Sequence, residues 1–333
     1  MNRKWLIIAF VLSFMIILGS SMGVAAKKPT VDPTISQLVT GLEGASGSTI
    51  GPGGALYVTE GAAGRISRVD PKTGEVTTFA EGLPQAIFPI GGANDLVFIG
   101  ETAYVLVTMV GPDIGGSDVV GIYRVDGPNS FTVIADIGQW SIDNPSGSDV
   151  FILSGVHYAM ESFHGGFLVS DGHHNRVLHA TLDGEVSEMI AFGNIVPTGL
   201  EVSGNTVYMA QAGPNPHLPE DGKVVTFGPQ SLAATEIASG APLLVDVEYG
   251  RGRTLFALSQ GDFPEGSGDG SPALPGTGSL VKVNSDGTVS PVAGGLDQPT
   301  SVEMIGNTAY VVTLTGEIWK IDGIAGPSYG LLH

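Results

Sequence analysis

Histidine is concentrated in one short part of the chain. Five of the seven histidines lie within residues 157–179. His157 leads into a predicted strand, and His173 and His174 occupy the predicted turn Asp171–Arg176. Neutral imidazole binds transition metals, but an exposed histidine pair in a turn is also ordinary. Because no pair has the HxxxH spacing of a metal motif, a ligand site and a solvated pair both remain open.

Four glutamates form a second group with chemical potential. They are Glu161, Glu201, Glu248 and Glu303. Each follows an apolar residue at the same position of a repeated strand pattern, and all but Glu161 also precede one. An ionised carboxylate is costly to bury without a partner, so we expect these side chains to face water or bind a cation. The alternative is that each is hydrogen-bonded locally, as buried polar groups usually are.

The strand pattern that carries the glutamates is clearest in Val196–Gln211. Leu200 and Val202 alternate with less apolar residues, and residues 203–205 supply a turn before a second strand, which predicts a β-hairpin. Five further copies follow the same order, at residues 45–60, 93–104, 156–171, 244–257 and 298–312. Most copies continue into a third and often a fourth short strand.

Six repeats of four short antiparallel strands predict an all-β, six-bladed β-propeller. The last copy stops early, near Asp322, and the segment Ile35–Val39 resembles the missing fourth strand. We therefore expect the N-terminal strand to close the ring. The predicted organisation is a signal peptide (1–26), a linker (27–34), one propeller domain (35–324) and a C-terminal tail (325–333). No long amphipathic helix is expected.

The first 26 residues resemble an export signal. Arg3 and Lys4 precede the apolar run Trp5–Leu18, and small residues continue to Ala26. The run of about 14 residues is shorter than the roughly 20 needed to cross a bilayer. We expect a secreted or periplasmic protein that leaves the membrane after cleavage, with an uncleaved anchor as the alternative. The chain has no cysteine, so its stability must come from the core.

The net charge of −19 limits the possible partners. An acidic surface repels nucleic acids and anionic membranes, whereas it attracts cations and basic or neutral partners. We therefore expect no nucleic-acid role. The predicted partner is a small molecule or a protein, bound by a monomer.

The longest predicted connections fall on one face of the propeller, which we call the long-loop face. They join second to third strands at residues 109–118, 213–221 and 261–276, and blade two to blade three at residues 138–155. Long loops without regular structure are often functional, so we place the binding site here. His217 could join the other histidines on this face. Nearby loop carboxylates are Asp113, Asp118, Glu220, Asp262 and Asp269.

Two segments, Gly53–Glu60 and Gly166–Val177, resemble NHL-type repeats and the six-bladed calcium-dependent phosphotriesterase-like propellers. Over nearly the whole predicted domain, the order of features resembles the ScyD/ScyE family. The features are Val39–Leu42, Gly51–Val58, Asn144-Pro145 and the loop before Gly278–Val283. This resemblance implies a secreted or periplasmic propeller without a firmly assigned reaction, because such repeats specify fold better than function.

Hydrolases of the phosphotriesterase-like superfamily hold calcium with Glu, Asn and Asp side chains at the channel mouth. The resemblance places Ser46, Asn94, Tyr158, Thr198, Val245 and Thr300 at these positions. Only Asn94 matches the pattern, with Asp95 and Asp246 one residue further along. The departures put a complete hydrolase site in doubt, and no GxSxG nucleophile motif replaces it.

Two sets of site residues follow. The predicted metal ligands, with calcium as the cofactor considered, are Asn94, Asp95, Asp246, Glu161, Glu201, Glu248 and Glu303. The predicted ligand-binding residues are His157, Tyr158, His173, His174, Thr198, His217 and Thr300. Two functions remain open: a binding or accessory protein acting through the long-loop face, and a metal-dependent hydrolase or lactonase.

Overall fold

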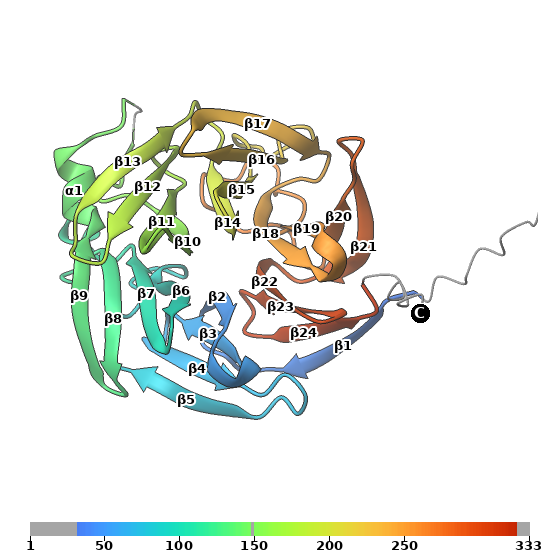
Figure 1. Ribbon diagram of the computed structural model, residues 1–333, viewed down its shortest axis with the longest axis horizontal. Helices are drawn as coiled ribbons and strands as arrows, with labels where there is room; N and C mark the ends of the chain where they lie inside the picture. Colours follow the sequence, from blue (N-terminus) through green and yellow to red (C-terminus); the bar gives the residue numbers. More distant parts are fainter. Residues whose placement is uncertain (1–31, 148–149, 325–333) are drawn as a thin grey trace, which may run out of the picture. The chain divides into compact units, whose positions relative to one another are not determined.

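The computed structural model describes residues 32–147 and 150–324, except for the side chain of Leu232. These residues form six four-stranded antiparallel sheets that follow one another around a ring. The first strand of each sheet faces the centre (Figure 1). The predicted six-bladed propeller is confirmed. The predicted signal peptide, most of the linker and the C-terminal tail lie outside the described residues.

Five blades are built from consecutive strands. Blade one contains β2 (Ala45–Ile50), β3 (Leu56–Glu60), β4 (Arg65–Val69) and β5 (Val76–Glu81). Blade two contains β6 (Gly92–Ile99), β7 (Thr102–Thr108), β8 (Gly121–Gly127) and β9 (Ser130–Asp136). Blade three contains β10 (His157–Phe163), β11 (Gly166–Asp171), β12 (Arg176–Thr181) and β13 (Val186–Ala191). Blade four contains β14 (Pro197–Ser203), β15 (Thr206–Gln211), β16 (Lys223–Gly228) and β17 (Ser231–Ser239). Blade five contains β18 (Leu244–Gly250), β19 (Thr254–Ser259), β20 (Gly278–Val283) and β21 (Val289–Leu296).

Blade six joins the two ends of the described chain. It contains β22 (Pro299–Ile305), β23 (Thr308–Thr313), β24 (Ile318–Asp322) and β1 (Thr34–Val39). β1 pairs antiparallel with β24, with Ile35 opposite Ile321. This pairing confirms the predicted closure of the ring by the N-terminal strand.

Burial follows the position of a strand within its blade. Every residue of β3, a second strand, is buried, because neighbouring blades cover both of its faces. In the outer strand β13, by contrast, only Ile190 is buried and the other residues are exposed or half-buried. Apolar clusters fill the gaps between blades, as where Leu106 and Ile122 of blade two contact Phe167 of blade three. The core is therefore a ring of interfaces between blades.

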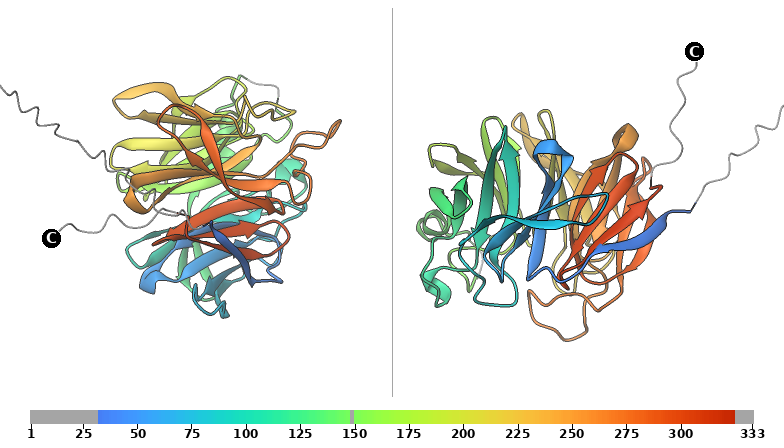
Figure 2. Two further views of the ribbon diagram at one scale, coloured as in Figure 1. Left: turned by 90° about the vertical axis from the view of Figure 1, so that its right-hand side faces the viewer. Right: turned by 90° about the horizontal axis from the view of Figure 1, so that it is seen from below.

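The connections differ sharply between the two faces. The 3-10 turns η1 (Pro52–Gly54) and η3 (Arg251–Arg253) belong to the opposite face, which we call the turn face. The long-loop face carries η2 (Pro112–Ile114), the helix α1 (Ile137–Asp143) and the β19–β20 connection. In the right-hand view of Figure 2, this connection extends from the lower side and η1 lies on the upper side.

The short helix α1 was not predicted from the sequence. The carboxylate of Asp136 caps its first turn by accepting a hydrogen bond from the Gln139 amide at 2.9 Å. Among the described residues, no helix is long and apolar enough to cross a membrane.

Candidate functional site

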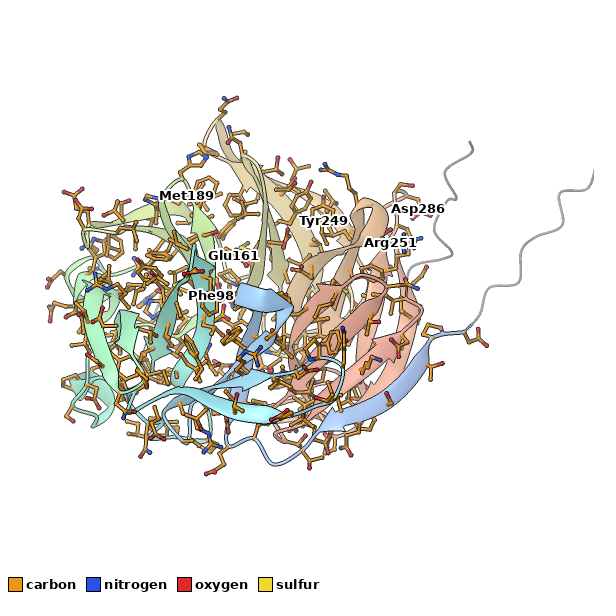
Figure 3. The ribbon with its side chains drawn as sticks, turned by 60° about the horizontal axis from the view of Figure 1, so that its bottom comes forward. Phe98, Glu161, Met189, Tyr249, Arg251 and Asp286 are labelled. Atoms are coloured by element: carbon orange, nitrogen blue, oxygen red, sulfur yellow. The ribbon has the colours of Figure 1, made fainter. Side chains whose placement is uncertain are left out.

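The four glutamates lie in register on the first strands of blades three to six. Glu161 pairs with Leu168, and Glu201 with Tyr208. Glu248 and Glu303 pair with the equivalent residues of blades five and six, Phe256 and Tyr310. Thr49 and Val97 occupy the same register in blades one and two. The predicted register is therefore present, and Glu161 is labelled beside the inner strands in Figure 3.

These four side chains, which we call the channel carboxylates, lack cationic partners. None of the Lys or Arg side chains in the described residues forms a salt bridge with them. Burial, followed by the negative charge of Glu201, raises the pKa of Glu161 well above its usual range. Burial and the neighbouring carboxylates also raise the pKa of Glu248 and of Glu303. The channel therefore favours protonated, neutral carboxyls.

Glu201 and Glu248 form a closer pair within this group. Burial raises the pKa of Glu201, and the neighbouring Glu248 carboxyl opposes the rise. Burial, followed by the charges of Glu303 and Glu201, raises the pKa of Glu248 well above its usual range. The two carboxyls therefore titrate as a pair and not independently.

Asp95 and Asp246 have a different role, because each ties two blades together. The Asp95 carboxylate accepts hydrogen bonds from the amides of Leu96 at 2.9 Å and Met160 at 2.7 Å. Asp246 repeats the pattern, with a bond from the Val302 amide of blade six at 2.7 Å. Burial raises the pKa of Asp246 to about 7.

Glycine makes room for these two carboxylates in the preceding blades. A Cβ atom at Gly47 would lie 2.3 Å from the Asp95 carboxylate, and one at Gly199 would lie 2.4 Å from that of Asp246. The same contact thus occurs twice around the ring. We interpret both aspartates as structural links between first strands.

Polar side chains at the channel mouth on the long-loop face bind one another. The Ser46 hydroxyl donates to the Asn94 Oδ1 at 3.0 Å, and the Asn94 Nδ2 donates to the carbonyls of Tyr158 at 2.7 Å and His157 at 3.3 Å. The Tyr158 hydroxyl donates to the Thr300 carbonyl at 3.1 Å. The Thr300 hydroxyl in turn donates a hydrogen bond to the Ser46 carbonyl at 2.7 Å. Ser46, Asn94, Tyr158 and Thr300 thus form a closed circuit, which we call the polar belt.

Tyr158 spans the channel, because its own strand belongs to blade three and its hydroxyl partner to blade six. Burial raises the pKa of Tyr158 well above its usual range, so its hydroxyl remains a donor. Val245, at the equivalent position of blade five, belongs to an apolar cluster against which Tyr158 packs. The Thr198 hydroxyl donates to the Ala210 and Leu244 carbonyls at 3.0 and 2.8 Å. The side chains at the mouth are thus engaged within the protein.

The predicted metal ligands do not converge. Within residues 32–147 and 150–324, no three His, Asp or Glu side chains lie close enough to hold a metal ion. The oxygens of Asp95 and Asp246 accept backbone amides, and the Asn94 amide belongs to the polar belt. A calcium site therefore stays a prediction without a preassembled set of ligands.

A second group of ionisable side chains lies under the long-loop face in blade three. The Asp171 Oδ2 accepts a hydrogen bond from the His174 Nδ1 at 2.6 Å and lies 3.4 Å from the Arg176 Nε. His157 Nε2 is 3.8 Å from the same oxygen, and neither of its ring nitrogens has a hydrogen-bond partner. All four side chains are almost completely buried. We call them the blade-three cluster.

The charges in this cluster compensate one another. Burial lowers the pKa of His157 to about 4, which keeps its ring neutral near pH 7. Burial alone would raise the pKa of Asp171, but His157, His174 and Arg176 lower it to about 2. The cluster therefore contains an ionised Asp171 that is paired with Arg176.

The cluster holds the connection from blade two to blade three. Asp171 accepts the Val156 amide at 3.3 Å. Arg176 Nη1 donates to the Asn144 carbonyl at 2.8 Å, and the guanidinium lies 4.9 Å from the centroid of the Trp140 ring. Both ends of residues 144–156 are thus fixed to blade three by one ion pair.

His173 fixes the middle of the same connection. Its Nε2 accepts the amides of Phe151 at 3.1 Å and Ile152 at 3.3 Å. The Phe151 ring meets the His173 ring edge-on, at a centroid distance of 4.6 Å. A nearby carboxylate, that of Asp113, accepts the Ser154 amide at 2.9 Å. His173 and Asp113 therefore hold residues 151–154 in place.

Two expectations about the histidines need correction. His173 and His174 are not a solvated pair, because His174 is only 2% exposed and bonds to Asp171, while His173 holds the loop backbone. His217 does not join them. It is buried against Phe263 of the β19–β20 connection, with a ring centroid distance of 4.8 Å.

Sequence reasoning missed the importance of Asp171 and Arg176. A signal was present, because Glu60 and Arg65 have the same spacing in blade one and form a salt bridge of 2.7 Å. The repeat places an acid at the end of a second strand and an arginine at the start of the third.

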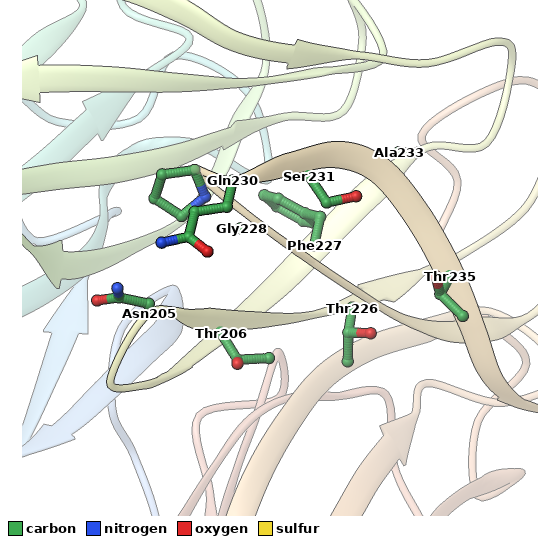
Figure 4. A pocket seen from close by; sticks show the side chains of 10 residues that line it. Asn205, Thr206, Thr226, Phe227, Gly228, Gln230, Ser231, Ala233 and Thr235 are labelled. Carbon is green, nitrogen blue, oxygen red and sulfur yellow. The ribbon is translucent and has the colours of Figure 1, made fainter.

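Two surface grooves lie away from both groups. One, of about 300 Å³, lies at the outer edge of blade four and is lined by uncharged residues, including Asn205, Thr226 and Gln230 (Figure 4). The other, of about 1040 Å³, lies between blades one and two and includes Glu81, Ile87 and Asp118. Of the two, only the second groove presents carboxylates.

Comparison with known proteins extends the structural description. No protein-family model and no curated protein sequence matches the chain. Among solved structures, a gluconolactonase from Xanthomonas campestris is similar with a TM-score of 0.61 and 12% identity, over 88% of this chain and 90% of that one. Virginiamycin B lyase from Staphylococcus aureus is similar with a TM-score of 0.54 and 12% identity, over 87% of this chain and 99% of that one. A PQQ-bound aldose sugar dehydrogenase from Streptomyces coelicolor has a TM-score of 0.56 and 14% identity, over 88% of this chain and 99% of that one.

These likenesses establish the fold. The chain is a six-bladed propeller with structural neighbours among gluconolactonases and virginiamycin B lyases. The neighbours act on different substrates, and one fold supports many chemistries. Function must therefore be argued from the side chains of this chain.

Proposed function

We propose that this chain is an exported, monomeric binding or accessory protein that acts through its long-loop face, as the ScyD/ScyE resemblance implies. Export is part of the proposal and rests on the signal-like residues 1–26. The net charge of −19 argues against a nucleic-acid or anionic-membrane partner.

The polar belt is the observation that carries this proposal. It occupies the level at which related hydrolases are expected to hold calcium. The Asn94 amide is engaged at both its oxygen and its nitrogen, and Tyr158 lies across the channel to Thr300. Opening this site to a metal and a substrate would break several buried hydrogen bonds, each costing about 1–3 kcal/mol if left unsatisfied.

The rival function is a metal-dependent hydrolase or lactonase. Its support is the fold similarity to gluconolactonases at 12% identity. Hard-cation sites gather several oxygen ligands around one point, whereas no three His, Asp or Glu side chains of the described residues are grouped in this way. The side chains therefore favour the binding role.

A metal-loading experiment separates the two functions. The purified protein would be dialysed against calcium, manganese or zinc, and both bound metal and turnover of δ-gluconolactone and a phenyl ester would be measured. We expect no stoichiometric metal and no turnover above buffer. One metal per chain, with turnover that is lost in Asn94→Ala, would establish the hydrolase instead.

A further inference from the structure

The described connections on the long-loop face contain acidic residues but no basic ones. Between the described strands on this face, the connecting segments contain no Lys or Arg. Their exposed acidic residues are Glu43, Asp113, Asp118, Asp143, Glu220, Asp262, Glu265 and Asp269. This face is therefore strongly anionic.

Cations at the adjoining strand ends neutralise little of this charge. Arg65 pairs with Glu60 at 2.7 Å and lies 3.6 Å from Glu43. Lys223 pairs with Glu236 at 2.8 Å. Arg176 is buried with Asp171 in the blade-three cluster. The turn face differs, because exposed Lys72, Arg251 and Arg253 lie in its turns.

The same connections expose large apolar side chains. Phe151 is 70% exposed and Leu153 50% exposed in the segment before blade three. Other exposed apolar residues on this face are Ile87, Phe88, Ile142, Leu218 and Leu274. Apolar side chains that are surrounded by charge are typical of protein interaction sites.

Phe151 is held in place before any partner binds. His173 accepts its amide and that of Ile152, and the two rings meet edge-on. Asn144 and Val156, at the two ends of the segment, are held by Arg176 and Asp171. A rigid, exposed aromatic side chain loses little conformational entropy on binding, which is the property of an interface anchor.

We infer that the long-loop face docks a cationic, amphipathic segment of a partner protein, with Phe151 as the apolar anchor. Charge complementarity identifies the partner, because lysine or arginine side chains would meet the exposed carboxylates while apolar side chains cover Phe151 and Leu153. The groove between blades one and two, with Ile87, Glu81 and Asp118, offers the same combination of surfaces. The inference names the partner class and rests on the proposed binding role.

The first test measures binding of a fluorescent helical peptide of lysine and leucine by anisotropy. We expect binding that weakens about tenfold or more between roughly 0.05 M and 0.5 M NaCl, because screening removes the attraction. A glutamate–leucine peptide should not bind, and a lysine–serine peptide should bind more weakly than lysine–leucine. Binding that is independent of salt, or equal for the three peptides, would overturn the inference.

Matched variants locate the surface. The triple variant Glu220→Lys, Asp262→Lys and Glu265→Lys should weaken peptide binding about tenfold or more. The control Glu75→Lys, Glu101→Lys and Glu185→Lys changes exposed acids in the turns of the other face and should not weaken it beyond the general effect of net charge. Equal weakening by both variants would reject a specific docking face.

Phe151→Ala should weaken binding of the lysine–leucine peptide about tenfold, whereas Val76→Ala on an outer strand should leave binding unchanged. Equal affinity of the two variants would remove Phe151 as the anchor. Melting curves confirm that each variant is folded.

Lactonase turnover would overturn the binding role itself, whereas absence of both turnover and peptide binding would overturn only the cationic partner.

Discussion

The channel carboxylates and the blade-three cluster both place ionisable groups inside the propeller, but their charges are compensated differently. In the cluster, Asp171 has Arg176 and His174 as partners and stays ionised. In the channel, Glu201 and Glu248 have only each other and neighbouring carboxyls, so their pKa values rise. In the cluster, the ion pair between Asp171 and Arg176 holds Asn144 and Val156. In the channel, the carboxyls avoid mutual repulsion by staying protonated.

The largest effect should come from breaking the cluster. Asp171→Asn leaves the buried Arg176 with only the half-exposed Glu188, at 3.8 Å, as a counter-ion, and removing one partner of a buried pair typically costs about 3–5 kcal/mol. Urea unfolding would measure the loss, with Asp183→Asn in an exposed turn as the control. A loss equal to that of the control would mean that Arg176 is not held by Asp171.

The second prediction concerns acid stability of the cluster. His157 has a folded pKa of about 4 against an ordinary value of 6.5, so the unfolded chain binds its proton first as pH falls. The contribution of neutral His157 to the free energy of unfolding is complete above pH 6.5. It is lost as pH falls toward 4, by up to about 3 kcal/mol. His157→Leu should therefore reduce the acid sensitivity of unfolding in this window. An unchanged pH profile would contradict a buried, neutral His157.

The channel should show the opposite pH dependence. A carboxyl whose folded pKa is raised contributes stability below its unfolded pKa near 4.5, and this stability is lost as pH rises through the folded value. The double variant Glu201→Gln and Glu248→Gln removes the charge. It should stabilise the protein by about 1–2 kcal/mol at pH 8 and less at pH 5. Equal effects at both pH values would mean that these side chains do not titrate in the channel.

The contrast also shows what the sequence could predict. The fold and the glutamate register follow from local patterns: Leu200 and Val202 set the alternation, and Glu201 lies between them. The polar belt was not predictable in this way. Its members are far apart in the chain. The Ser46 hydroxyl donates a hydrogen bond to Asn94, 48 residues later, and the Ser46 carbonyl accepts one from the hydroxyl of Thr300, 254 residues later.

The histidines illustrate the same limit. Their grouping in blade three was visible, but their surroundings depend on Asp171 and on the backbone at Phe151 and Val156. His217 shares the face without sharing the site, since its neighbour Phe263 comes from another connection. Residue type identified candidates, whereas tertiary contacts decided which of them act together.

The central claim is that the channel is not a preassembled metal site and that binding takes place on the long-loop face. Melting curves of the wild type and of Glu201→Gln/Glu248→Gln, each with and without calcium at constant ionic strength, test it most directly. A ligand that binds only the folded state raises its melting temperature. We predict no calcium-dependent rise in either protein. A rise in the wild type that the double substitution abolishes would contradict the account and establish a cation site in the channel.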